Sequence, residues 1–417
     1  MTTTAKHLVP FVVVALAFAC SQDHQSQPET GIWRATLATP GGELPFGLEI
    51  RLAEPTGDVS SSFIAYIING EERIAVNDIT VTGDSIFLRL PVFDSEIRAE
   101  IISRTLLMGR WVDYNRDNYS IPFRAEHGVK HRFGVSTPGE RREERWEVTF
   151  SPDSSNEAKS IGIFHFDGDY VEGTFLTETG DYRYLEGMMR NDSLLLSCFD
   201  GAHAFLFKAK RTGNGMSGTF WSGTHFREEW VAVLNPDFKL RDADSLTFLK
   251  PGYERFEFAF PDPDDNMVSL DDFKGLVVIV QIMGSWCPNC MDEAVFFADA
   301  WREYHDRGLE IIGLAFEKTR DFKTARDRVL RMKEHLDIPY PILIAGFRNP
   351  REVEEKLPAL NRLMSYPTSI FIDREGEVRR IHTGFNGPAT GEVFLEFQRD
   401  FHELIQGLLA DAPVGSL

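Results

Sequence analysis

The sequence predicts two structural regions of different class, an all-β region followed by an α/β domain. Between Gly31 and about Val233, short alternating apolar runs are separated by Gly, Asn and Asp turns at hairpin spacing, with almost no helical periodicity. Beyond Phe256, apolar strands alternate with helical patterns, which is typical of an α/β layer structure. A chain of 417 residues has room for two or three such domains.

The β region contains an internal duplication. Three landmarks recur in one order: a tryptophan-led strand, an Asp-Ser strand and a Gly-x-aromatic triplet. The copies are Trp33–Leu37 and Trp146–Phe150, Asp84–Ser95 and Asp192–Gly201, and Gly109–Trp111 and Gly218–Phe220. We expect two related halves of about five strands each that close into one barrel or pack as a sandwich.

The α/β part has a readable element order. Strands are expected at 276–282, 310–316, 341–344, 369–372 and 378–382, and helices at 293–307, 322–336, 351–360 and 391–409. The predicted division is a signal peptide at 1–19, a polar tether at 20–29, the β domain at 30–235, a linker at 236–250 and the α/β domain at 251–412.

The N-terminus reads as a targeting segment. The apolar stretch Leu8–Phe18 is too short to span a bilayer and has the length of a signal-peptide core. Its end, Leu16 to Cys20, resembles the lipobox of bacterial lipoproteins, although Ala17 stands where Leu is more usual. That resemblance implies lipidation at Cys20; the alternative is an ordinary cleaved signal. Either way we expect an extracytoplasmic protein, in a compartment where disulfides persist.

Composition excludes some functions. A formal net charge of -20 argues against a nucleic-acid partner, because phosphate binding needs clustered Lys and Arg. The acidic loop Asp262–Asn266 lacks the glycine and downstream glutamate of a calcium loop. A solvated turn is therefore expected there, and no metal site. No cofactor is expected either, beyond a redox-active disulfide between Cys287 and Cys290.

The chemistry concentrates in Trp286-Cys287-Pro288-Asn289-Cys290, directly after the apolar run 276–280. One helical turn between the two cysteines allows a redox-active disulfide to close, and the helix N-terminus favours the thiolate of the first. Cys198 lies in an apolar strand-like run and is expected to be a buried structural thiol.

Several further motifs surround this pair. Together they are Val268–Gly275, Gly284–Cys290, Tyr366–Thr368, Phe371–Gly376 and Thr383–Phe385. With these motifs, the segment from about Tyr253 to Leu409 resembles the extracytoplasmic thioredoxin-like proteins of the TlpA/ResA type, related to the AhpC/TSA group. This resemblance implies a thioredoxin-like fold and thiol–disulfide oxidoreductase activity.

The resemblance also implies roles for individual residues. Cys287 would be the attacking thiolate, and the more buried Cys290 would resolve the mixed disulfide. Pro367 would be a cis-proline facing the disulfide. The implied substrate-binding set is Trp286, Pro288, Tyr366, Pro367 and Thr368.

Two acids are candidates for moving the proton of Cys290. Glu293 lies one turn after Cys290, where it could act as a base or be a solvated surface acid. Glu317, at a strand end, is the second candidate. Gln281 occupies the place of thioredoxin's buried aspartate and cannot shuttle a proton, so the base is Glu293, Glu317 or water.

Three functions compete. The first is a reductase or isomerase of exported proteins, recharged by a membrane electron donor of the thiol type, facing the periplasm and lipid-anchored to a bacterial membrane. The second is an AhpC/TSA-type thiol peroxidase, although Val280 and Gly284 stand where peroxide-orienting Pro and Thr or Ser are needed. The third is a binding lipoprotein whose redox domain is accessory.

Overall fold

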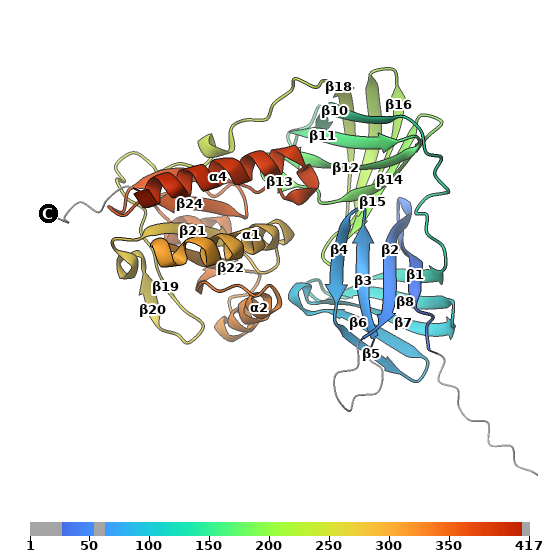
Figure 1. Ribbon diagram of the computed structural model, residues 1–417, viewed down its shortest axis with the longest axis horizontal. Coiled ribbons are helices and arrows are strands. Elements are labelled where there is room, and N and C mark those ends of the chain that lie inside the picture. The colour runs from blue at the N-terminus through green and yellow to red at the C-terminus, as the bar shows by residue number, and fades with distance from the viewer. Residues whose placement is uncertain (1–26, 54–62, 411–417) are drawn as a thin grey trace, which may run out of the picture.

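The computed structural model describes residues 27–53 and 63–410 (Figure 1). The predicted signal peptide and Cys20 lie outside the described residues. No helix within the described ranges has the length and apolar character needed to cross a membrane.

The first half of the β region forms one sheet. In the described residues its strand order is β4-β3-β2-β1-β9-β8-β7-β6-β5, and every paired neighbour is antiparallel. Its strands are β1 Gly31–Thr39, β2 Gly42–Leu52, β3 Phe63–Asn69, β4 Glu72–Val76, β5 Asp78–Thr82, β6 Ser85–Leu90, β7 Ser95–Ser103, β8 Leu106–Asp113 and β9 Tyr119–His127.

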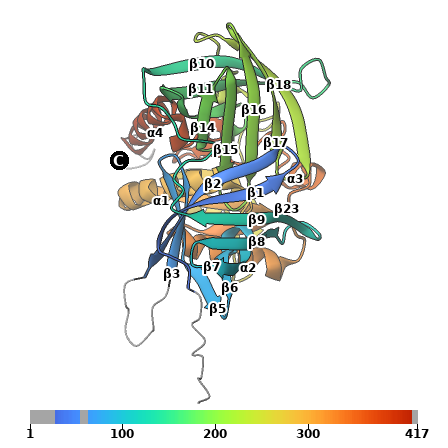
Figure 2. The same ribbon diagram turned by 90° about the vertical axis from the view of Figure 1, so that its right-hand side faces the viewer.

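The second half forms a separate sheet, ordered β11-β10-β18-β17-β16-β15-β14-β12-β13. Because β11 also pairs with β12, this sheet closes on itself and leaves only the short β13 outside the ring (Figure 2). Its strands are β10 Arg141–Phe150, β11 Ala158–Asp167, β12 Tyr170–Thr177, β13 Gly180–Asp181, β14 Leu185–Arg190, β15 Ser193–Phe199, β16 Ala204–Thr212, β17 Gly215–Ser222 and β18 Phe226–Leu234.

The two sheets repeat one strand order, as expected of a duplicated unit. In each, the tryptophan-led strand (β1 or β10) lies between the second and the last strand of its half. Trp33 and Trp146 at these equivalent strands are both completely buried. The predictions of five strands per half and of one barrel closed by both halves were wrong, because the described residues give nine strands to each half and each half builds its own sheet. The two sheets contact each other, with Phe199, Ala204 and Leu206 of the second half in the core of the first.

The α/β domain has a five-stranded sheet ordered β23-β22-β21-β24-β25. Strands β21, β22 and β23 are parallel, and β24 is antiparallel to both of its neighbours, β21 and β25. Strands are β21 Val277–Met283, β22 Leu309–Glu317, β23 Ile342–Phe347, β24 Thr368–Ile372 and β25 Val378–Thr383, preceded by the short hairpin β19 Ala259–Pro261 and β20 Met267–Ser269. Helices are α1 Pro288–Tyr304, α2 Phe322–His335, α3 Pro350–Lys356 and α4 Glu392–Ala410.

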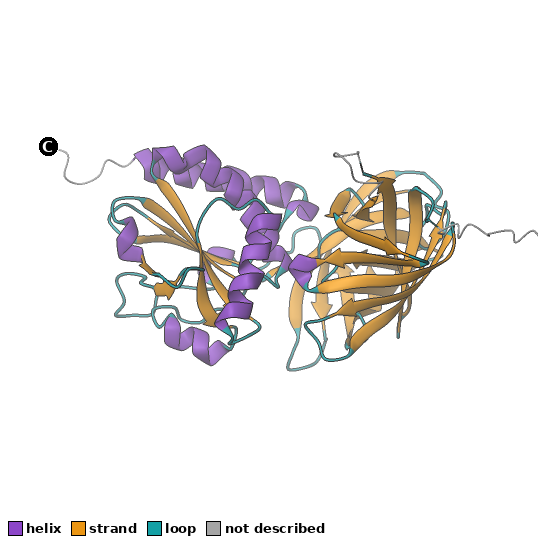
Figure 3. Cartoon of the chain, turned by 90° about the horizontal axis from the view of Figure 1, so that it is seen from below, coloured by secondary structure: helices purple, strands orange, loops and turns teal. Residues whose placement is uncertain are grey.

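Helices cover this sheet on both faces (Figure 3). Alternate residues of β21 point to opposite sides. Val277 and Ile279 pack with α1, α2 and α4, while Val278 and Val280 pack with α3 and the Phe256–Phe260 segment. A strand buried on both faces explains the continuous apolar run in the sequence. The cysteine loop directly follows the carboxyl end of β21, so it lies at the end of the sheet that faces the β region.

Candidate active site

Cys287 is the N-cap of α1. Pro288 occupies the first helical turn, where a missing backbone N–H costs nothing. The Cys287 sulfur accepts a hydrogen bond from the backbone N–H of Cys290 (3.3 Å), and its thiol donates to the carbonyl oxygen of Tyr366 (3.3 Å). The first cysteine is thus held between the helix N-terminus and the Tyr366 backbone.

Cys290 lies one turn inside the helix and is completely buried. Both cysteines are free thiols in this structure, so the site is in its dithiol form. Burial, then the hydrogen bond and charge of Cys287, raise the pKa of the Cys290 thiol well above its usual range, and the charge of Glu293 adds to this. Cys290 can attack only after a base has removed its proton.

The peptide bond between Tyr366 and Pro367 is cis and packs opposite Cys287. The Pro367 carbonyl accepts a hydrogen bond from the N–H of Gly384 (2.9 Å). Thr368 is buried and its hydroxyl donates to the carbonyl of Ser365 (2.9 Å). Pro367 and Thr368 therefore shape the turn from within, and Tyr366 is the residue of the turn that faces the cleft described below.

Glu293 is completely buried, so the alternative of a solvated surface acid is wrong. Its two carboxylate oxygens accept from Gln281 Nε2 (2.9 Å) and Ser369 Oγ (2.9 Å). Gln281 Nε2 also donates to the carbonyl of Cys290 (3.2 Å), and Tyr340 donates to Gln281 Oε1 (3.1 Å). Burial raises the pKa of Glu293 to about 8, although the Gln281 and Ser369 hydrogen bonds oppose this. A carboxyl group poised near neutrality lies beside the resolving cysteine.

Glu317 is also buried, at the end of β22. It accepts the backbone N–H of Ser285 (2.8 Å) and the Ser285 hydroxyl (2.9 Å). Burial raises its pKa, and these two bonds oppose the shift. Because both oxygens bind the loop that precedes Cys287, the contacts of Glu317 suit a positioning residue better than a proton carrier.

Trp286 covers the other side of Cys287. Its indole N–H donates to the Phe316 carbonyl (3.0 Å), and its ring meets Tyr366 edge to face at 5.3 Å. Lys318 Nζ lies 5.2 Å and Arg348 Cζ 4.6 Å from this ring. Two cations thus lie against the tryptophan that borders the nucleophile.

Cys287 opens into a cleft of about 750 Å³ between the α/β domain and the β region, whereas Cys290 does not line it. The α/β wall includes Trp286, Cys287, Pro288, Arg348 and Tyr366. The opposite wall consists of strand ends at one end of the closed second sheet, with a few residues of the first half, among them Phe150, Thr177, Phe205, Phe220, Phe226 and Arg116. Cys287 therefore faces the end of a β-barrel-like sheet.

Side chains fix the two walls together. Asn289 Nδ2 donates to the carbonyls of Asp181 (3.3 Å) and Phe385 (3.2 Å). Arg183, almost completely buried, forms ion pairs with Asp292 of α1 and with Glu72 of the first sheet. The β region is thus in direct contact with the helix that carries Cys290.

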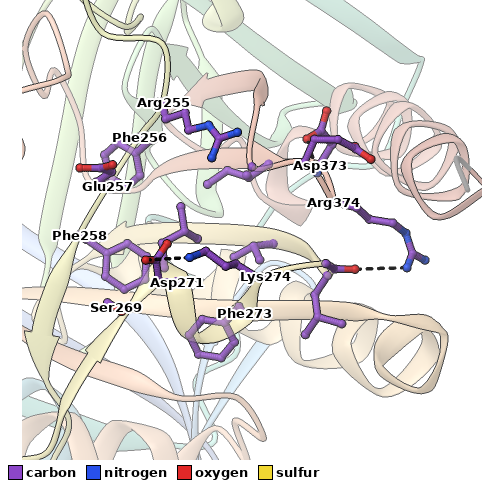
Figure 4. A pocket seen from close by; sticks show the side chains of 17 residues that line it. Arg255, Phe256, Glu257, Phe258, Ser269, Asp271, Phe273, Lys274, Asp373 and Arg374 are labelled. Carbon is purple, nitrogen blue, oxygen red and sulfur yellow. Dashed lines mark hydrogen bonds and ion pairs between the residues drawn. The ribbon is translucent and has the colours of Figure 1, made fainter. Parts of the chain in front are cut away.

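A second, smaller hollow of about 280 Å³ lies at the other end of the α/β sheet, where strand β21 begins (Figure 4). It is lined by charged groups such as Arg255, Asp271, Lys274 and Arg374, and Lys274 pairs with Asp271 at 2.9 Å. Since no cysteine lines it, this hollow is separate from the dithiol.

Sequence reasoning placed both cysteines, Glu293 and the Tyr366–Pro367 turn, but it missed the residues brought in by tertiary contacts. Ser369, Tyr340, Lys318, Arg348 and Arg183 stand at no diagnostic spacing from the cysteines. Of these residues only Ser369, directly after the Tyr366–Thr368 motif, had a neighbouring motif that could have pointed to it. In the described part of the chain no three His, Cys, Asp or Glu side chains are grouped to hold a metal ion.

Comparison with known proteins agrees with this geometry. Residues 251–381 match the AhpC/TSA family. The thiol-disulfide oxidoreductase ResA of Oceanobacillus iheyensis is 25% identical over 121 residues, covering 29% of this chain and 56% of that protein. The thioredoxin-like protein YneN of Bacillus subtilis is 25% identical over 136 residues, covering 33% of this chain and 73% of YneN.

Among solved structures, a thioredoxin-family thiol:disulfide interchange protein from Chlorobium tepidum aligns with a TM-score of 0.30 and 21% identity, over 37% of this chain and 95% of that one. The alignment to ResA of O. iheyensis spans a little over half of that relative. The C-terminal part of this chain is an AhpC/TSA domain whose relatives include proteins named thiol-disulfide oxidoreductases.

Proposed function

We propose that this protein is a membrane-anchored thiol–disulfide oxidoreductase that acts on exported proteins through Cys287 and Cys290. The observation that carries the proposal is the pairing of a cleft-lining sulfur at the N-cap of α1 with a completely buried second thiol one turn inside it. This asymmetry suits an attacking and a resolving cysteine.

The exchange would run in two steps. The Cys287 thiolate attacks one sulfur of a substrate disulfide, which forms a mixed disulfide and releases the other substrate sulfur as a thiolate. Cys290, once deprotonated, attacks the Cys287 sulfur, closes the Cys287–Cys290 disulfide and releases the second substrate thiolate. The two protons of the dithiol end on the two substrate thiols, so the substrate gains two electrons and the enzyme loses two.

We assign the second proton to Glu293. Its burial raises its pKa to about 8, so near neutral pH it exists in both protonation states and can accept or return a proton. Gln281 holds this carboxylate and the Cys290 backbone with one amide group, which fixes their separation. Glu317 would act indirectly, by holding the Ser285 loop.

The remaining parts of the proposal rest on the sequence. Lipidation at Cys20 would tether the chain to a bacterial membrane on its periplasm-facing side. There a membrane thiol donor would return the dithiol to its reduced form. The direction we propose is reduction or isomerisation of substrate disulfides. The Cys287–Cys290 pair would be the only redox group, with no added cofactor.

Two observations disfavour the peroxidase alternative. Val280 lies in the middle of β21, paired with β22 on one side and β24 on the other, where a proline would lose a ladder hydrogen bond. A Cβ at Gly284 would lie 2.2 Å from the Trp286 indole nitrogen. The side chains that would orient a peroxide are therefore incompatible with the present loop.

A trapping experiment tests the proposed function. Cys290→Ser should accumulate a mixed disulfide between Cys287 and a disulfide-bonded protein substrate, identified by non-reducing electrophoresis and mass spectrometry. Cys287→Ser should give none, and Cys198→Ser should behave as the wild type. Trapping through Cys290 in the Cys287→Ser variant, or no trapping at all, would contradict the assignment.

A further inference from the structure

We propose that the end of the closed second sheet is a substrate subsite. Resting on the proposed function, this inference names the substrate class: an extended peptide segment with an aromatic side chain on one flank of its cystine and a carboxylate on the other. The inference depends on three features of the cleft, namely its aromatic wall, its unpaired cations and its size.

The aromatic wall comes from the second sheet. Phe150, Tyr182, Phe205 and Phe220 line the cleft, and they contact one another at ring separations between 5.3 and 6.3 Å. Phe226 extends this wall to solvent, with 46% of its surface exposed and its ring 6.0 Å from that of Phe220. Phe150, Phe205 and Phe220 are themselves buried, so Phe226 and the half-buried Tyr182 are the rings of this wall that a ligand can reach. Reachable aromatic rings in the cleft that holds the nucleophile favour an apolar ligand group.

The acids and histidines of the cleft are already satisfied within the protein. Asp113 pairs with Arg116 at 3.1 Å, Asp181 accepts the N–H of Gly387 at 2.6 Å, and Glu228 accepts the hydroxyl of Ser151 at 2.8 Å. Of the histidines, His203 contacts Asp200 at 3.1 Å and His225 contacts the Tyr119 hydroxyl at 3.1 Å.

Lys318 and Arg348 differ from these groups. Among the described residues neither forms an ion pair, although both lie against Trp286 at the edge of the cleft. Burial, and then repulsion by the charge of Arg348, lower the pKa of Lys318. A substrate carboxylate beside the cystine would meet both cations and relieve that repulsion.

Size selects an extended segment over a folded surface. The cleft of about 750 Å³ falls within the range of small-ligand sites and holds only a few peptide residues. Cys287 has only 6% of its surface exposed, and Asn289, two residues further on, is bonded to the Asp181 carbonyl of the β region. A flat protein face cannot reach a sulfur at that depth, whereas a single extended chain or a protruding loop can.

The experiment measures kcat/KM for reduction of four disulfide peptides of one length. They differ only at two flanks of the cystine, with Phe or Ala at one and Glu or Lys at the other. We expect the Phe/Glu peptide to be the best substrate, each flank contributing about three- to tenfold. Glutathione disulfide, acidic but without an aromatic group, should rank below it.

Variants assign the two preferences to their residues. Phe226→Ala should abolish the advantage of Phe over Ala, while Phe248→Ala, an equally exposed phenylalanine outside the cleft, should leave it unchanged. The double variant Lys318→Gln/Arg348→Gln should abolish the advantage of Glu over Lys, and Lys318→Arg/Arg348→Lys should keep it. Lys239→Gln, on the exposed linker, is the matched charge control.

The outcomes separate this inference from the proposed function. If all four peptides are reduced at equal rates, the enzyme is an oxidoreductase and the subsite is refuted. If the flank preferences exist but survive the cleft variants, the subsite is also refuted. If no peptide is reduced and Cys290→Ser traps no partner, the proposed function itself fails. If glutathione disulfide outranks every peptide, the cleft serves a small anionic disulfide and the peptide class is overturned.

Discussion

Arg183, in the connection between β13 and β14, forms an ion pair with Asp292 of α1, two residues beyond the buried Cys290. The same guanidinium pairs with Glu72 of the first sheet and lies 3.6 Å from Asp200. One buried cation therefore neutralises acids from both halves of the β region and from the redox domain. The three parts of the chain meet at this residue, next to the dithiol.

Loss of this cation should be costly. Arg183→Met leaves Glu72, Asp200 and Asp292 without their shared partner, and breaking a buried pair in this way costs about 3–5 kcal/mol. The free energy of unfolding in urea should fall by that order. Arg227→Met, which removes an exposed pair with Glu229, should cost less than about 1 kcal/mol. Equal effects of the two substitutions would show that the Arg183 cluster does not join the domains.

Glu293 should control the second step of exchange. Glu293→Gln keeps the size of the side chain that contacts Gln281 and Ser369, but its amide cannot take the proton of Cys290. Release of substrate from a preformed mixed disulfide should therefore slow about 100-fold. In the wild type that rate should rise as pH passes through about 8. Stopped-flow detection of the released thiol measures both effects. Asp299→Asn, exposed on the same helix, is the control; a Glu293→Gln rate equal to the control rate would exclude Glu293 as the base.

The same carboxyl group should make stability depend on pH. Its pKa is about 8 in the folded protein against 4.5 for the free group, so the unfolded chain releases the proton first as pH rises. The contribution to stability is present below pH 4.5 and is lost between pH 4.5 and 8, at up to about 1.4 kcal/mol per pH unit.

Urea unfolding of the wild type and of Glu293→Gln, at several pH values across this window, measures that contribution. It is the difference between the free energies of unfolding of the two proteins. Relative to the variant, the wild type should lose stability toward pH 8. A difference that stays constant with pH would mean that the folded and unfolded states bind this proton equally.

Cys198 should be chemically silent. It is completely buried in β15, and burial raises the pKa of its thiol well above the usual range. Native protein treated with an alkylating reagent should therefore be modified at Cys287 long before Cys198, as peptide mass spectrometry would show. Modification of Cys198 at a comparable rate would indicate that the second sheet opens in solution.

Local patterns predicted the helices and strands of the α/β domain well, because each element has its own pattern of apolar residues. The expected helix at 322–336 is Phe322–His335, and the expected strand at 310–316 is Leu309–Glu317. Helix α1 begins earlier than expected, because Pro288 and the Cys287 cap start it at the motif itself. The number of strands in the β region was predicted poorly, because tight turns that a single sequence does not resolve separate its short strands.

The residues of the site likewise divide into those that belong to local sequence motifs and those that only tertiary contacts bring together. Cys287, Cys290 and the Tyr366–Pro367 turn belong to contiguous motifs and could be identified from the sequence alone. The burial of Glu293 depends on Ser369, which is 76 residues away in sequence, and the cleft depends on strand ends of the β region. Such contacts are set by the packing of domains, which leaves no periodic trace in the chain.

The most direct test of dithiol exchange is a glutathione redox titration of the purified protein, with alkylation and mass spectrometry at each point. Cys287 and Cys290 should change together in a single two-electron transition. Because burial and Glu293 disfavour the Cys290 thiolate, the reduced form gains little stabilisation, and the potential should lie well below the roughly −120 mV of the oxidant DsbA. A potential near that value would contradict a reducing role, and independent oxidation of the two cysteines would contradict the exchange mechanism itself.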